Sequence, residues 1–144
     1  MSTSQHQFVI DGGSGKKAIF DSPSLGDGGL IERYRLTLES PRMTAATDVD
    51  NPTWCQQLSE YFRDLADHWK GWDGSKRWQA GEGEFSIDSA MSKQGHVFVR
   101  ITVNVYGSPS DWIAMAELDI ESSQLDHIAR AASRFFGPSK SGSG

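Results

Sequence analysis

The sequence predicts a single α+β domain: a largely antiparallel sheet of about five to seven strands, with two helices packed on one face. Two stretches carry apolar residues at helical spacing, most of the remainder alternates with period two, and 144 residues fit one domain. The amphipathic helices need an apolar surface to cover, and one face of the sheet supplies it. We expect the domain to span residues 1–138 and residues 139–144 to form a flexible tail.

The N-terminal third is predicted to form short strands. Residues 8–10 and 18–20 are apolar and flank a glycine-rich turn, and residues 22–29 are typical of a turn-rich loop. Alternating apolar residues then mark one further strand, and residues 43–49 are a candidate for another. The alternating residues are Tyr34, Leu36 and Leu38.

The first helix is predicted to follow Asn51, a good N-cap, with Pro52 in the first helical position, where its missing N–H costs nothing. Its apolar residues recur at spacings of three and four, and Gly71 is the expected stop. The apolar stripe consists of Trp54, Leu58, Tyr61, Phe62, Leu65 and Trp69.

The C-terminal half is predicted to be a three-strand meander followed by the second helix. Phe85 and Ile87 mark its first strand, and residues 97–106 alternate and lead through a turn to a second alternating run at 112–120. The inward set is Val97, Val99, Ile101, Val103 and Val105, and the outward set is Phe98, Arg100, Thr102, Asn104 and Tyr106. A helix starting near Ser122 or Ser123 ends at Gly137-Pro138.

Charge and composition exclude several classes of function. The formal net charge is −5 and there is no Lys/Arg-rich stripe, which argues against a nucleic-acid partner. No apolar run reaches the roughly 18 residues of a membrane-spanning helix, and the polar start lacks the apolar region of a signal peptide. The single cysteine, Cys55, excludes an internal disulfide. A cytoplasmic protein is therefore expected.

The candidate catalytic and metal motifs are weak. Residues 11–17 lack the spacing of a phosphate-binding loop, and the four histidines lack the spacing of a helical metal site, so we expect no metal and no cofactor. His96 could lie near Asp111 or Asp119 across the C-terminal hairpin, which would permit acid–base chemistry. A structural histidine at a strand start is commoner, so the sequence favours a non-enzymatic protein.

The most distinctive stretch is residues 69–78, which holds three tryptophans in ten residues. We expect Trp69 and Trp78 to close one end of the core. Trp72 has two open interpretations: packing on the turn, or recognition of a partner together with Arg77, because Trp and Arg are typical of interface hot spots.

Together with the Gly95–Val103 run and the Trp112–Leu118 run, this stretch resembles an uncharacterised bacterial domain family with a Trp-x-Gly-Trp and Gly-His-Val core. It resembles, more distantly, the WapI-like immunity proteins of polymorphic toxin systems. The resemblance covers about residues 31–136. It implies a cytoplasmic protein that neutralises a cognate toxin by covering it, and it brings no catalytic residues.

The leading hypothesis is therefore a non-enzymatic protein-binding domain whose partner is a cognate protein toxin. The candidate partner-binding residues are Trp72, Arg77, Phe98, Arg100, Asn104 and Tyr106. The alternative is a small-molecule-binding domain with a Trp-lined pocket between the sheet and the helices. A hydrolase that uses His96 ranks third, and pairing of the exposed sheet face with a second copy also stays open.

Overall fold

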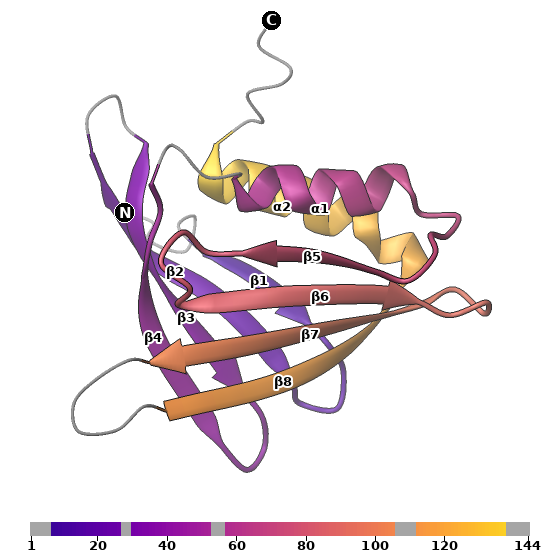
Figure 1. The fold of residues 1–144 in the computed structure, drawn as a ribbon, viewed down its shortest axis with the longest axis horizontal. Helices are drawn as coiled ribbons and strands as arrows, with labels where there is room; N and C mark the ends of the chain where they lie inside the picture. The colour runs from indigo at the N-terminus through magenta and orange to yellow at the C-terminus, as the bar shows by residue number, and fades with distance from the viewer. Residues whose placement is uncertain (1–6, 27–29, 53–56, 106–111, 138–144) are drawn as a thin grey trace, which may run out of the picture.

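The computed structural model describes residues 7–26, 30–52, 57–105 and 112–137. It contains two antiparallel four-stranded meanders, each followed by a helix (Figure 1). The first half comprises β1 (Phe8–Asp11), β2 (Lys17–Leu25), β3 (Ile31–Glu39), β4 (Thr44–Asp50) and α1 (Leu58–Asp67). The second comprises β5 (Ser75–Gln79), β6 (Phe85–Met91), β7 (His96–Val105), β8 (Trp112–Glu121), a 3₁₀ turn (Ser122–Gln124) and α2 (Leu125–Phe136).

The predicted single sheet of five to seven strands is wrong, because the eight described strands form two sheets. The chain is mostly sheet with some helix. Alternation shows that a segment is a strand with one buried face, but it does not show which strands pair. The strand β5 was not predicted, because Trp78 is its one buried residue and no alternation of apolar residues marks it.

The predicted strand positions are otherwise confirmed, as is the β7–β8 hairpin. The last helical segment begins near Ser122 as predicted, as a 3₁₀ turn that leads into α2 at Leu125. The predicted start of the first helix is wrong, because Asn51 and Pro52 are not helical and α1 begins at Leu58 with Gln57 as its N-cap.

The loop predicted at 22–29 is partly wrong, since β2 continues to Leu25. The register against β3 shifts between Asp21 and Ser24, and Ser22 has a φ of 54°. This bulge accommodates Pro23, which has no N–H to give to a ladder. Residues 53–56, with Cys55, lie outside the described residues, as does the predicted tail at 139–144.

The core lies between the inner faces of the two sheets and beneath the helices. Phe20 of β2 is fully buried, with its ring centroid 5.1 Å from Phe8, 5.9 Å from Tyr34 and 6.1 Å from Phe85 of the second sheet. Phe136 of α2 approaches the same ring at 6.2 Å. Aromatic pairs at such distances stabilise beyond the area they bury. One aromatic cluster therefore joins both sheets and the last helix.

The two helices lie side by side along the same edge of the sheets (Figure 1). Arg63 of α1 donates a hydrogen bond to the Asp126 carboxylate at the start of α2, over 3.2 Å. This hydrogen bond, followed by the charge of Arg130, holds the pKa of Asp126 below its ordinary value. The groups are exposed to solvent, so the pair contributes little to stability and mainly orients the helices.

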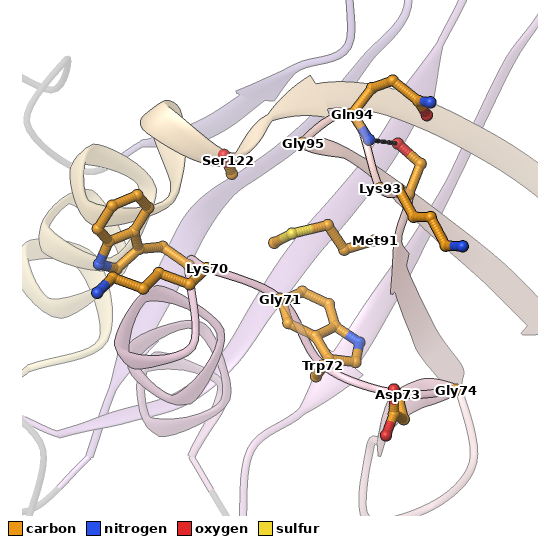
Figure 2. Close-up of a pocket in the computed structure, with 12 residues that line it drawn as sticks. Lys70, Gly71, Trp72, Asp73, Gly74, Met91, Lys93, Gln94, Gly95 and Ser122 are labelled. Atoms are coloured by element: carbon orange, nitrogen blue, oxygen red, sulfur yellow. Dashed lines mark hydrogen bonds between the residues drawn. The ribbon is translucent and has the colours of Figure 1, made fainter.

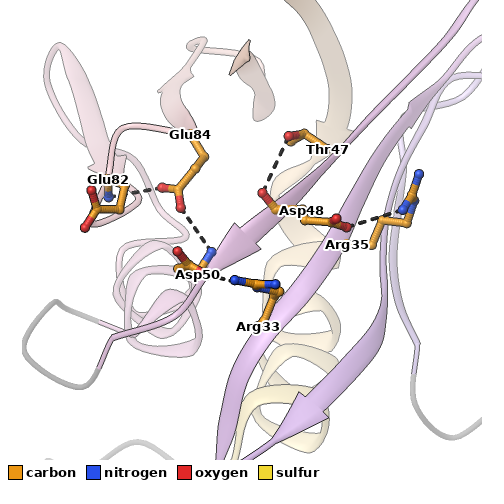
Figure 3. A network of polar contacts seen from close by, with 7 residues as sticks. All are labelled: Arg33, Arg35, Thr47, Asp48, Asp50, Glu82 and Glu84. Atoms are coloured by element: carbon orange, nitrogen blue, oxygen red, sulfur yellow. Dashed lines mark hydrogen bonds and ion pairs between the residues drawn. The ribbon is translucent and has the colours of Figure 1, made fainter. Parts of the chain in front are cut away.

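A polar network joins the end of β4 to the β5–β6 turn (Figure 3). The Glu84 carboxylate accepts hydrogen bonds from the backbone N–H groups of Asp50 and Glu82, both over 3.0 Å. Arg33 pairs with Asp50 across β3 and β4. Within the described ranges, no cluster of three or more His, Cys, Asp or Glu residues is arranged to hold a metal ion.

None of the helices in the described part of the chain is both long and apolar enough to cross a bilayer. The longer of the two α-helices, α2, has 12 residues, whereas a spanning helix needs about 20.

The aromatic cluster generates the first prediction. Phe20→Ala should lower the free energy of unfolding by about 3–5 kcal/mol, because it removes a fully buried ring that touches both sheets. Phe98→Ala, a matched control at a solvent-facing position with 37% exposure, should cost about 1 kcal/mol or less. Urea unfolding followed by circular dichroism measures both. Equal losses would contradict the assignment of the two faces.

Candidate functional site

The second sheet presents one face to the core and the other to solvent. On β7, Val97, Val99, Ile101 and Val103 are buried, whereas the residues between them point outward. Register alignment carries this division across all four strands. We call the solvent-facing side the outer face; its principal residues are Arg77, Asp88, Phe98, Arg100, Thr102, Asn104, Ile113, Met115, Glu117 and Asp119.

A row of alternating charges crosses the middle of the outer face. Arg77 of β5, Asp88 of β6, Arg100 of β7 and Glu117 of β8 are successive register neighbours. The Arg77 guanidinium lies 3.2 Å from the Asp88 carboxylate, and Arg100 lies 3.4 Å from Glu117. Each charge is thus balanced by a neighbour. Because such exposed pairs are weak, a partner can redirect these side chains at low cost.

Apolar side chains lie on one side of this row. On β8, Ile113 is 68% exposed and Met115 is 57% exposed. Trp112 is also exposed, but it pairs with Val105 and so lies on the opposite side of the sheet. Single exposed apolar residues are ordinary, but a contiguous group on one strand is typical of an interaction surface. The apolar group therefore makes this end of the outer face the strongest candidate for docking.

Phe98 and His96 lie on the other side of the charged row. The two rings stack with centroids 6.4 Å apart, and His96 Nδ1 is 3.0 Å from the Asp119 carboxylate. The predicted proximity of His96 to Asp119 is confirmed, whereas Asp111 lies outside the described residues. Both partners are about half exposed on an open sheet surface. Such a setting is typical of a surface hydrogen bond rather than of an acid–base pair held away from water.

Four of the predicted partner-binding residues lie together on the outer face: Arg77, Phe98, Arg100 and Asn104. The side chain of Asn104 has a local partner, because its amide donates to the Gly83 carbonyl over 3.2 Å and so holds the β5–β6 turn. Tyr106 lies outside the described residues. The structure therefore brings together Arg77, Phe98 and Arg100 on one solvent-facing surface, the two arginines in exposed ion pairs with Asp88 and Glu117.

Trp72 lies away from the outer face, in the connection between α1 and β5. Its indole N–H donates to the Ser89 carbonyl of β6 over 3.1 Å, and the ring packs against the core. It lines a surface hollow, shown in Figure 2, together with Trp69, Met91, Lys93 and Ser122. The packing interpretation of Trp72 thus has direct support, and the hollow is a separate candidate site.

The predictions for the other two tryptophans have different outcomes. Trp78 is 4% exposed, with its ring 5.2 Å from that of Phe85, so its role in the core is confirmed. The prediction for Trp69 is wrong, since this residue is 53% exposed. The helix ends at Asp67, and Trp69 therefore lies past the last turn, off the apolar stripe.

Sequence reasoning missed Ile113 and Met115 as site residues. The signal was present in the alternation of β8, where positions 114, 116, 118 and 120 face inward. Ile113 and Met115 occupy outward positions, which further along the same strand hold Glu117 and Asp119. Apolar residues at outward positions of a well-defined strand indicate an interaction surface.

Ser89 of β6 contacts both Trp72, in the connection between α1 and β5, and Tyr61 of α1. Ser89 is fully buried, and its hydroxyl oxygen lies 2.7 Å from the Tyr61 hydroxyl of α1. Tyr61 also donates to the Lys76 carbonyl over 2.9 Å. Burial is the main cause that raises the pKa of Tyr61 above its ordinary value. A neutral tyrosine therefore ties α1 to β5 and β6 at the edge of the hollow.

Tyr61→Phe tests this connection. Removal of the Tyr61 hydroxyl should lower the free energy of unfolding by about 1 kcal/mol near neutral pH. The pKa of Tyr61 is raised in the folded protein. The hydroxyl therefore contributes fully to stability below about pH 10, where tyrosine is neutral in the unfolded chain too. Above about pH 10 this contribution declines, because the unfolded chain loses the proton first. The stability gap between wild type and Tyr61→Phe should therefore narrow above about pH 10 in denaturant titrations. A gap constant through about pH 11 would contradict this assignment.

Comparisons with known proteins give a family but no activity. No curated protein matches the chain. Among solved structures, a plant transcriptional regulator, PBF-2, is similar with a TM-score of 0.49 and 7% identity, over 90% of this chain and 80% of that chain. Similarity at this level carries no argument about function.

The profile of a family of unknown function, DUF6228, matches residues 11–139. This confirms the expected membership of an uncharacterised domain family. The Trp-x-Gly-Trp core and the likeness to immunity proteins receive no support from the comparisons and stay predictions. Since the match spans most of the chain, the protein belongs to the family of unknown function DUF6228.

Proposed function

We propose that this domain binds another protein through the outer face of its second sheet. The observation that supports the proposal most strongly is the exposed apolar group of Ile113 and Met115 beside the balanced row of charges. Interfaces commonly combine an apolar centre with a polar rim, and arginine is enriched in their hot spots. Arg100 and Phe98 supply these residue types next to the apolar group.

A hydrogen-bonded sheet suits this role because its face is already ordered. Most inward residues of β6 and β7 are packed in the core, as are Leu118 and Ile120 of β8, which fixes the outward positions of these strands. Binding to a preformed surface costs little ordering entropy. The outer face can therefore dock without rearrangement of the backbone.

The proposed partner is a basic protein. The domain carries a net charge of −5, and β8 adds Glu117, Asp119 and Glu121 next to the apolar group. Complementary charge speeds encounter and favours a positively charged surface. In its specific form, the proposal is an immunity protein of the cytoplasm that covers a basic toxin. The same charge disfavours nucleic acid as the ligand.

Matched charge reversals test the outer face. Tagged wild-type domain, Arg100→Glu and Arg134→Glu would each be used to capture partners from a lysate of the native host. Arg134 lies on α2 and is exposed, so the control makes the same change in charge on another surface. A partner that is retained by wild type and Arg134→Glu, with at least about tenfold weaker binding to Arg100→Glu, would support the proposal. Equal retention by all three would contradict it.

The toxin-neutralising form needs a second readout. The captured partner should arrest growth when it is expressed alone. Growth should return on co-expression of wild type or Arg134→Glu and fail to return with Arg100→Glu. A partner that is harmless alone would overturn the immunity role and leave the protein-binding role standing.

The hollow in Figure 2 supports a second candidate function, the binding of a small anionic ligand. Trp69, Trp72 and Met91 offer apolar surface, while Lys70 and Lys93 offer positive charge. This hollow lies on the surface, between the α1–β5 connection and the β6–β7 turn.

A thermal-shift screen of anionic aromatic compounds tests this second candidate. A true ligand should raise the melting temperature of wild type but not of Lys93→Glu, because stabilisation follows occupancy. Lys17→Glu, on β2 of the other sheet, is the control and should respond like wild type. An equal response of all three would place the ligand elsewhere.

A further inference from the structure

The strand β8 forms one edge of the second sheet, with hydrogen-bonding groups that face away from β7. Two bonds fix which residues these are. The Asn104 N–H donates to the Glu84 carbonyl, so Asn104 faces β6 and its partner Ile113 faces outward. At the other end, the Ser122 N–H donates to the Gly95 carbonyl. Because an antiparallel ladder alternates, the backbone groups at odd-numbered positions of β8 point to the open edge.

The C-terminal half of this edge already has partners. The Lys16 ammonium donates to the Glu117 carbonyl over 3.4 Å, and the Glu121 N–H donates to the Gln124 side chain over 2.9 Å. At Ile113 and Met115, no residue in the described ranges bonds the outward backbone groups. The open edge is therefore confined to residues 112–116.

This open segment lacks the usual protection of an edge strand. Residues 112–116 carry no charge and no proline, and Trp112, Ile113 and Met115 are exposed. Edge strands normally carry charged residues or proline, which discourage pairing with other chains. The β4 edge of the first sheet shows the contrast, since it holds Asp48 and Asp50 in ion pairs.

We propose that two copies of this chain pair through β8 in antiparallel orientation, centred on Ala114. Ile113 then lies opposite Met115 of the second copy, and Ala114 lies opposite itself. Both Ile113 and Met115 have outward backbone groups, so four new N–H to carbonyl bonds form. A centre at Met115 would need the Glu117 carbonyl, which Lys16 already occupies.

The charges of β8 favour the same arrangement. Glu117, Asp119 and Glu121 all follow the uncharged segment. In the antiparallel pair the acidic halves extend in opposite directions from the two-fold axis, whereas a parallel pair would place them side by side. The two Ile113 and two Met115 side chains form one apolar cluster on the outer face. This pairing goes beyond the proposed function and joins two sheets into one of eight strands.

Light scattering and sedimentation of the full chain across the micromolar range test the dimer. Wild type should show a concentration-dependent dimer. Met115→Pro should raise the dissociation constant roughly tenfold to a hundredfold, because one outward N–H is lost from each copy. The ladder to β7 does not use this N–H, so circular dichroism should show a folded monomer.

Thr102→Lys is the control that changes the outer face but leaves the edge of β8 intact. Thr102 is the β7 neighbour of Met115 and points to the outer face without reaching the edge. The dimer should survive this substitution. Loss of the dimer in Thr102→Lys but not in Met115→Pro would overturn edge pairing in favour of face-to-face stacking. A wild type that stays monomeric at every concentration would also overturn the proposal.

Engineered cysteines test the register in a Cys55→Ser background. Residues opposite each other at a position without ladder bonds have Cα atoms about 4.5 Å apart, which a disulfide spans. Ala114→Cys should therefore give a covalent dimer under mild oxidation, and Ala116→Cys should not. Cross-linking through position 116 but not 114 would overturn the proposed register. Because this readout needs no other protein, it is independent of the result of partner capture.

Discussion

The packing of Phe20 against Phe85 is the contact on which the rest of the structure depends. Phe20 comes from the first sheet and Phe85 from the second, and their ring centroids lie 6.1 Å apart. Tyr34 and Phe136 complete the cluster, so the last helix is bound to the same point. Neither meander could bury its apolar face alone. Their mutual burial makes the eight strands and two helices one structure.

This packing determines which surfaces remain for function. Each sheet uses its inner face for the core, and the helices cover one edge of the pair (Figure 1). On the second sheet, the outer face and the start of β8 stay open, and both carry apolar side chains. Ile113 and Met115 therefore take part in both proposed interactions. Docking of a partner uses their side chains on the outer face, whereas edge pairing uses their backbone N–H and carbonyl groups. A dimer would extend the outer face over two copies.

The polar contacts act at the margins of this core. Glu84 links the end of β4 to the β5–β6 turn, and Tyr61 links α1 to β5 and β6 through Lys76 and Ser89. The Glu84 contacts are exposed, whereas the contact between Tyr61 and Ser89 is buried. A buried hydroxyl that lost its partners would cost more than an exposed pair, so the Tyr61 contact has the larger effect on the position of α1 and the hollow beside it.

The sequence by itself determined both helices, most of the strands and the face that most of them bury, although it left β5 unrecognised. Alternation identified β7 and β8, and with them Phe98 and Arg100 as outward residues, because side-chain direction in a strand has a period of two. It did not determine that the strands divide into two sheets, since pairing depends on contacts distant in the chain. The exposure of Trp69 and the open backbone edge at Ile113 and Met115 were likewise decided by tertiary structure. Both depend on where neighbouring elements end, which no local pattern encodes.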